Sequence, residues 1–279
     1  MKINLAKSAG FCFGVRRAVD IAFGIAKSGA AVYMLGDIVH NERVIDEMKK
    51  TGIIKINRLA RGKNRNLLIR AHGTGRQIIE KAKGLGYNII DATCPMVKDI
   101  HRIAKNMEAQ GYQIIIIGDK LHDEVHGIIG QLKNKAVVID SPGNIPFKTI
   151  EKIPRAAIVV QSTQNTENAL LISKRLKFLI KELKFFNTVC RPTRMKQEEI
   201  KKMPSVNDVM IIIGSKNSAN TKRLYEIAAG LNKRSYWVNA KKEIRPGWFK
   251  NVETVGITAG ASTPDTTIKE IVGYIKRIK

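Results

Sequence analysis

The sequence has few cysteines and no long apolar run. Only three of its 279 residues are Cys, an odd number that argues against the disulfide framework of small secreted proteins and favours a reduced compartment. No stretch approaches the roughly 20 apolar residues that a membrane span needs, and Asp20 and Gly24 interrupt the most apolar part of the N-terminal region. We therefore expect a cytoplasmic protein with no membrane association.

Acidic and aromatic residues are also scarce. The chain has 24 Asp and Glu against 49 Lys and Arg, a formal net charge of +25, and such an excess is common in proteins that bind nucleic acids or other polyanions. The basic residues are spread along the whole chain, however, and aromatic residues, which stack on bases, make up only 6% of it. The charge fits acidic protein partners and phosphorylated substrates equally well.

Several common ligand-binding motifs are missing as well. The sequence contains neither a Walker A motif nor a G-x-G-x-x-G motif, so nucleotide binding of those two kinds has no support. It contains no C-x-x-C pair. Hydrophobic residues nevertheless make up 44% of the chain, which is ordinary for a folded protein and too much for a disordered one.

The chain repeats itself in register with its cysteines. Each Cys is followed 24 residues later by a glycine at the end of an apolar, strand-like run, and 28 residues later by a His or Ser. The cysteines are Cys12, Cys94 and Cys190, the glycines Gly36, Gly118 and Gly214, and the polar residues His40, His122 and Ser218. Equal spacing in three segments indicates an internal repeat.

A second strand-like run in each repeat leads into another polar loop, and the three loops contain His72, Ser162 and Ser262. A helix pattern follows each loop, for example over 166–178 and 265–278. This alternation predicts an α/β fold of three similar small domains with mostly parallel sheets, in a pseudo-threefold, trefoil-like arrangement around a central cleft. We expect the domains at 13–95, 96–190 and 191–279, with 1–12 contributing a strand to the third.

The cysteines stand at predicted strand-to-helix junctions, where ligands of open α/β sheets bind. A sparse intracellular Cys is usually a small buried apolar residue, but three thiols in equivalent loops favour a metal or a nucleophile. They could bind zinc together with a His, or an iron–sulfur cluster with one iron left without a protein ligand. The spacing does not choose between these.

The polar loops suggest an anion site. His40, His72, His122, Ser162, Ser218 and Ser262 are neutral donors ahead of predicted helices, a set that suits a phosphate or diphosphate. Glu124 would be the proton carrier of such a basic site, although a carboxylate at a helix start is often only a dipole partner. We expect His101 on a solvated helix surface.

Nine short motifs resemble those of the LytB family in order and along nearly the whole chain. They are GFCFGVRRA at 10–18, VHN at 39–41, AHG at 71–73, DATCP at 91–95, HDEV at 122–125, QST at 161–163, NTVC at 187–190, GSKNS at 214–218 and TAGASTP at 258–264. The resemblance implies reductive dehydroxylation of 4-hydroxy-3-methylbut-2-enyl diphosphate to isopentenyl and dimethylallyl diphosphates. It also implies a three-domain trefoil-like α/β fold.

The same resemblance implies a [4Fe–4S] cluster on Cys12, Cys94 and Cys190, with electrons delivered singly by an external carrier. Glu124 would supply a proton, and Ser162, where the family commonly has Thr, would relay it and orient the substrate alcohol. The diphosphate would be held by His40, His72, His122, Ser218, Asn220 and Ser262. Ala219 and the pair Arg191-Pro192 also depart from the family pattern.

Partners follow from the same reading. They are an allylic diphosphate substrate and an acidic electron carrier of the ferredoxin or flavodoxin type, with no nucleic acid and no membrane. Two alternatives stay open: a basic nucleic-acid-binding protein with a structural metal, and a cluster-dependent dehydratase that needs no external electrons.

Overall fold

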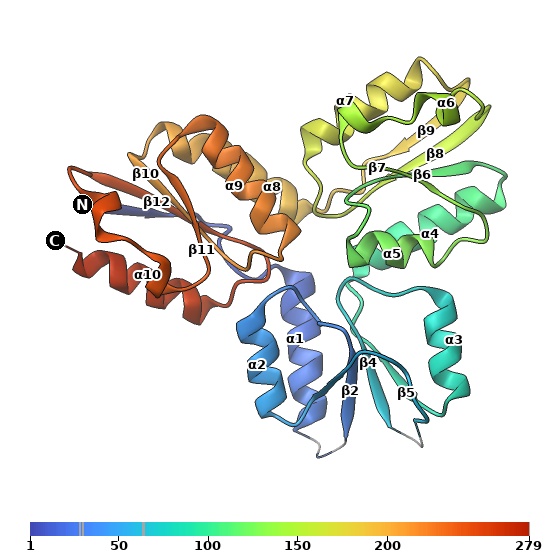
Figure 1. The fold of residues 1–279 in the computed structure, drawn as a ribbon, viewed down its shortest axis with the longest axis horizontal. Coiled ribbons are helices and arrows are strands. Elements are labelled where there is room, and N and C mark those ends of the chain that lie inside the picture. Colours follow the sequence, from blue (N-terminus) through green and yellow to red (C-terminus); the bar gives the residue numbers. More distant parts are fainter. Residues whose placement is uncertain (28, 30, 63–64, 279) are drawn as a thin grey trace. The chain divides into compact units, whose positions relative to one another are not determined.

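The computed structural model describes residues 1–27, 29, 31–62 and 65–278, so Lys279, at the end of the expected third domain, lies outside the described residues. Its strands form three four-stranded sheets, and every strand pairing in them is parallel (Figure 1). The α/β class with parallel sheets is therefore confirmed. No described helix combines the length and apolar character that crossing a membrane requires.

The first sheet has the strand order β3-β2-β4-β5. Its strands are β2 (Val32–Leu35), β3 (Ile54–Ile56), β4 (Asn66–Ile69) and β5 (Asn88–Asp91), and its helices are α1 (Phe13–Ala26), α2 (Glu42–Lys50) and α3 (Arg76–Gly84). Leu67 and Ile69 of β4 pack with Ala82 of α3 and with Tyr87, which holds α3 against one face of the sheet.

The second sheet has the order β7-β6-β8-β9. Its strands are β6 (Gln113–Ile117), β7 (Val137–Ile139), β8 (Arg155–Val160) and β9 (Glu182–Phe186), and its helices are α4 (Pro95–Ala109), α5 (Asp123–Ile129), α6 (Phe147–Ile150) and α7 (Thr166–Lys177), with a 3-10 turn η1 (Pro142–Asn144).

Apolar residues occupy both faces of this second sheet. Alternate residues of β6 point to opposite sides, so Ile115 packs with Ile150 of α6 and Ile172 of α7, whereas Ile116 packs with Ile100 of α4. Helices accordingly cover both faces (Figure 1). The unbroken apolar runs of these strands are typical of parallel sheets buried on both sides.

The third sheet has the order β1-β12-β10-β11, so the N-terminal strand pairs with a strand near the C-terminus. Its strands are β1 (Lys2–Leu5), β10 (Val209–Ile213), β11 (Ser235–Val238) and β12 (Thr254–Ala259); its helices are α8 (Arg191–Lys202), α9 (Ala219–Leu231) and α10 (Asp265–Arg277), with 3-10 turns η2 (Met203–Ser205), η3 (Lys241–Glu243) and η4 (Pro246–Phe249).

The chain divides into two compact units. Unit 1 contains Met1–Arg16, Val39–Ile45 and Arg191–Lys279, and therefore the third sheet; unit 2 contains Arg17–Ile38 and Asp46–Cys190, and therefore the first two sheets. The segment with His40 thus belongs to unit 1, although the sequence repeat assigns it to the first domain. The boundaries 13–95, 96–190 and 191–279 stay a prediction.

Within unit 2, two glycines bring the first and second sheets' helices close together. Gly75 precedes α3 and Gly130 ends α5, and the N–H of Arg76 donates to the carbonyl of Gly130 over 2.9 Å. A Cβ atom added at Gly130 would lie 2.5 Å from the Cα of Gly75. This separation is too short for any side chain, so the contact requires glycine.

We expect Gly130→Ala to lower the free energy of unfolding by about 1–3 kcal/mol, the usual cost of overpacking. Gly24→Ala in α1 is the matched control, because a Cβ there meets nothing within 4 Å and Ala is the better helix former by roughly 0.5–1 kcal/mol. Urea unfolding midpoints of the two variants measure the difference. A Gly130→Ala midpoint as high as that of Gly24→Ala would show that the close contact is not formed.

Candidate active site

A buried carboxyl group lies at the carboxyl ends of β6 and β8 in unit 2. Glu124 in the first turn of α5 is 1% exposed, and Ser162 lies in the loop after β8. The Ser162 N–H donates to Oε1 of Glu124 over 2.6 Å, and the Ser162 hydroxyl donates to Oε2 over 2.8 Å. One serine therefore fixes both carboxyl oxygens.

Burial raises the pKa of Glu124 to about 7, and the negative charge of Asp119 adds to this, while the two hydrogen bonds from Ser162 partly oppose it. A carboxyl group with such a pKa carries a proton in a large fraction of molecules at neutral pH. Glu124 can therefore act as an acid under conditions in which an ordinary glutamate is fully ionised.

Two neighbours fix the loops around Glu124. The fully buried Gln161 accepts a hydrogen bond from the N–H of Asp119 over 2.8 Å and donates to the hydroxyl of Thr163 over 3.0 Å, so it joins the loops after β6 and β8. Asp123 forms an ion pair of 2.6 Å with Arg70. Arg70 and Gln161 lie in or beside recognised motifs, but nothing in the sequence assigned them these roles.

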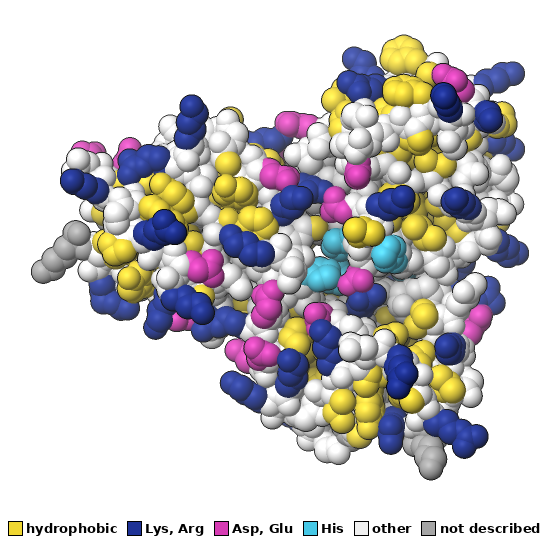
Figure 2. All heavy atoms as spheres, viewed as in Figure 1, with side chains coloured by type: hydrophobic (Ala, Val, Ile, Leu, Met, Phe, Trp, Pro, Cys, Tyr) yellow, Lys and Arg dark blue, Asp and Glu magenta, His cyan; other side chains and the backbone are white. Residues whose placement is uncertain are grey.

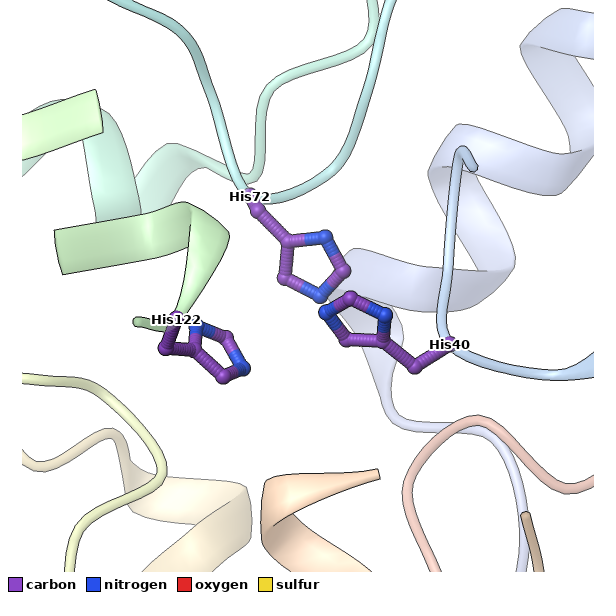
Figure 3. A group of neighbouring side chains, drawn as sticks. All are labelled: His40, His72 and His122. Atoms are coloured by element: carbon purple, nitrogen blue, oxygen red, sulfur yellow. The ribbon is translucent and has the colours of Figure 1, made fainter. Parts of the chain in front are cut away.

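His122 precedes α5 and has a defined tautomer when it is neutral. Its Nδ1 accepts the N–H of Glu124 over 3.1 Å, so the proton of the neutral ring lies on Nε2. The ring meets that of His72 edge to face, with centroids 5.4 Å apart and an interplanar angle of 86°. Figure 3 shows these two imidazoles with that of His40, which comes from the segment between β2 and α2.

In unit 1, the structure joins His40 to the loop after β12, because the Ser262 hydroxyl donates to the His40 carbonyl over 3.1 Å. Ser218 caps α9 by accepting the N–H of Thr221 over 3.3 Å. Asn220 is 4% exposed, and its amide nitrogen is buried with no hydrogen-bond partner among the described residues. An unpaired buried donor costs about 1–3 kcal/mol, so this amide is suited to an acceptor from a ligand.

Glu42 supports this part of unit 1 and was not anticipated from the sequence. It accepts hydrogen bonds from the hydroxyl of Ser215 over 2.8 Å and the side-chain amides of Asn217 and Asn239 over 3.0 and 3.3 Å. Burial raises the pKa of Glu42, but these bonds and its own backbone N–H outweigh burial and bring the pKa below its ordinary value. Glu42 thus links the His40 segment to the loop before Ser218.

The three cysteines each follow a strand and precede a helix, are half-buried, and form no disulfide. Their backbone N–H groups donate to carbonyls of neighbouring loops: Cys12 to Ala261, Cys94 to Ala71 and Cys190 to Ser162. Cys12 lies in unit 1, whereas Cys94 and Cys190 lie in unit 2. Thiols held on anchored loops, outside the apolar core clusters, fit a metal-ligand role.

The expectation of a solvated His101 is wrong. Its imidazole packs on the loop after β4, where a Cβ at Gly73 would lie 2.8 Å from Cε1, and the Nε2 atom is buried. Burial lowers the pKa of His101 to about 4. The negative charge of Asp91 opposes this shift, and the positive charge of Lys105 adds to it. The neighbouring Lys98 and Arg102 are themselves exposed, in ion pairs with Asp91 and Asp99, whereas the His101 ring lies against Gly73.

The raised pKa of Glu124 predicts a pH-dependent stability. Because the folded pKa of about 7 exceeds the ordinary glutamate value of 4.5, the stabilisation from its proton is fully present below about pH 4.5 and is lost as the pH rises through 7. The loss is up to roughly 3 kcal/mol. We therefore expect the unfolding midpoint of Glu124→Gln to rise relative to that of the unmodified protein between pH 5 and pH 8, because only the unmodified protein loses this stabilisation. An unchanged difference between the two midpoints would show that Glu124 titrates normally.

Comparisons with known proteins agree with this arrangement. A family model described as LytB protein matches residues 3–276. The 4-hydroxy-3-methylbut-2-enyl diphosphate reductase of Geotalea daltonii is 39% identical over 278 residues, covering 100% of this chain and 98% of the relative. That of Aquifex aeolicus is 39% identical over 280 residues, covering 99% and 96%.

Solved structures match as well. A structure of (E)-4-hydroxy-3-methyl-but-2-enyl diphosphate reductase, the terminal enzyme of the non-mevalonate pathway, is 38% identical, with a TM-score of 0.72 and coverage of 100% of both chains. The structure of the Plasmodium falciparum E-1-hydroxy-2-methyl-but-2-enyl-4-diphosphate reductase is 28% identical, with a TM-score of 0.90 and coverage of 97% of this chain and 86% of that chain.

Proposed function

Because the chain belongs to the LytB family, we propose that it is a reductase that removes the hydroxyl group of 4-hydroxy-3-methylbut-2-enyl diphosphate. Two electrons and two protons enter, the C–O bond breaks, water leaves, and a new C–H bond gives isopentenyl or dimethylallyl diphosphate. The observation that carries this proposal is the match to reductases along almost the whole chain. The buried, proton-holding pair Glu124 and Ser162 supplies the acid that the reaction needs.

The family depends on iron and sulfur, and the donor set of this chain fits such a cofactor. Soft thiolates are the usual ligands of iron–sulfur clusters, and the three cysteines lie on anchored loops without disulfides. We propose that Cys12, Cys94 and Cys190 hold a [4Fe–4S] cluster. When bound, such a cluster supplies electrons one at a time and one iron that has no cysteine ligand.

The chain's hydrogen-bond donors suit the diphosphate. Neutral imidazole, hydroxyl and amide groups bind a polyanion without the cost of a buried net charge. Nε2–H of His122 is a defined donor, and the amide of Asn220 needs an acceptor. The proposed ligands are His40, His72, His122, Ser218, Asn220 and Ser262.

Glu124 delivers the proton to the departing hydroxyl group in this proposal. Its carboxyl group is protonated in part at neutral pH, and the Ser162 hydroxyl contacts its Oε2. A hydroxyl group both donates and accepts hydrogen bonds, so Ser162 can orient the substrate alcohol and pass the proton on. Ser162 has the same hydroxyl group as the Thr that the family commonly has at this position, and this role requires only that group.

The direct test is turnover of the allylic diphosphate by protein prepared without oxygen, with and without a chemical reductant. We expect both diphosphate products only when the reductant is present. Conversion to a product without consumption of electrons would instead support a cluster-dependent dehydratase. A nucleic-acid-binding protein would not convert the allylic diphosphate at all. Figure 2 also disfavours that alternative, because the Lys and Arg side chains of this chain are dispersed over the visible face and are not gathered in a stripe.

We expect Glu124→Gln to bind the diphosphate and lose about 10²–10⁴-fold in kcat, since the amide has the shape of the acid but cannot donate a carboxyl proton. Steady-state kinetics with a saturating reductant measure this loss. Glu151→Gln, at an exposed position after α6, is the control and should keep full activity. A Glu124→Gln enzyme within a few-fold of the unmodified one would show that the proton comes from elsewhere.

The basic surface suggests how electrons arrive. We propose an acidic carrier of the ferredoxin or flavodoxin type as donor, because a net charge of +25 attracts an acidic protein over long range. A cytoplasmic location remains a prediction.

Turnover driven by such a carrier should fall steeply with salt, because the Debye length shortens from about 10 Å at 0.1 M to about 3 Å at 1 M. Turnover driven by a small chemical reductant should fall much less at saturating diphosphate, which makes it the control. Equal salt dependence of the two rates would argue against a docking role for the basic surface.

A further inference from the structure

A buried lysine grips the loop that carries Cys12. Lys196 of α8 is 2% exposed, and its ammonium donates hydrogen bonds to the carbonyls of Ser8, of Gly10 over 3.0 Å and of Ala259 over 3.2 Å. A buried ammonium is costly unless its N–H donors are satisfied. The three carbonyl groups accept hydrogen bonds from the Lys196 ammonium group and so stabilise its buried charge.

The carbonyls belong to two segments that meet next to Cys12. Ser8 and Gly10 lie in the loop between β1 and α1, and Ala259 ends β12. Gly10 has a φ of +91°, in the left-handed region that favours glycine. The Cys12 N–H donates to Ala261, two residues beyond Ala259. The ammonium therefore ties the Cys12 loop to the end of its neighbouring strand.

Glu199, three residues after Lys196 on the same helix, holds the same loop through its N–H groups. Its carboxylate accepts from the N–H of Lys7 over 2.6 Å, from the N–H of Ser8 over 2.9 Å and from the Ser8 hydroxyl over 2.6 Å. Burial raises the pKa of Glu199, but these bonds and the charge of Lys196 outweigh it, so the pKa lies below its ordinary value. Helix α8 thus binds carbonyl groups of the Cys12 loop through the ammonium of Lys196, and N–H groups of the same loop through the carboxylate of Glu199.

Helix α8 also connects these contacts to a second cysteine. The helix begins at Arg191, directly after Cys190, so the pair Lys196 and Glu199 links the loop of one cysteine to the helix that follows another. We propose that Lys196 and Glu199 are positioning residues that preorganise Cys12 as a cluster ligand. The proposal rests on the proposed function, and neither residue is assigned contact with the substrate.

The test compares Lys196→Met and Glu199→Gln, which keep side-chain length, with Lys202→Met and Glu198→Gln at exposed positions of the same helix. Removing a residue that orients a ligand typically costs about 10–100-fold in metal affinity. With that loss in the dissociation rate, we expect iron loss to a chelator about 10- to 100-fold faster in the first pair, in full-length protein loaded with its cluster. The visible spectrum of the cluster should also change in that pair, whereas the controls should match the unmodified protein.

A second readout does not depend on the cluster. In iron-free full-length protein, iodoacetamide alkylation of Cys12, followed by peptide mass spectrometry, should be at least several-fold faster in Lys196→Met and Glu199→Gln, while the rate at Cys94 stays unchanged. This arm still tests the positioning role if the unmodified protein binds no cluster, an outcome that would count against the proposed function alone.

Unchanged Cys12 alkylation in both variants would overturn the proposal. Equal acceleration at Cys12 and Cys94, or failure of both variants to fold, would overturn it too, since the pair would then stabilise the fold in general. Lys196→Arg keeps the charge and several donors, so it should restore part of the protection of Cys12.

Discussion

Parallel pairing of the strands is the constraint on which the site depends. In a parallel sheet all strands end at the same edge, and burial of both faces leaves only that edge and its loops for polar side chains. Every strand pairing in the three described sheets is parallel. The consequence is that Cys94, Glu124 and Ser162 of unit 2 all stand in strand-end loops or first helical turns, although they are far apart in the sequence.

Burial then gives these side chains their chemistry. Glu124 is shielded from water between α5 and the loop after β8, and Ser162 supplies both of its hydrogen bonds. Water around the carboxyl group would return its pKa to the ordinary range, and an unbonded buried carboxylate would be unstable. In unit 1 the same logic applies to Lys196, whose buried charge is balanced by carbonyls and by Glu199.

The fold was largely predictable because it leaves a periodic signal. The equal spacing from Cys12, Cys94 and Cys190 to the following glycines reflects one repeated unit of helix and strand. Isolated chemical groups such as Glu124 could be identified from their position at the start of a predicted helix.

Their partners could not, because a side chain that bonds to the backbone of a remote segment follows no sequence period. Lys196 reaches a carbonyl 188 residues away in the chain, and Glu199 an N–H 192 residues away. His101 shows the converse: its charged neighbours suggested solvent, but its ring packs against Gly73 with the Nε2 atom buried.

The iron and sulfide content of protein purified without oxygen, with its visible spectrum, tests the central claim most directly. The account predicts a brown protein with about three to four irons per chain and matching acid-labile sulfide, whereas a colourless protein with zinc or no metal would contradict it.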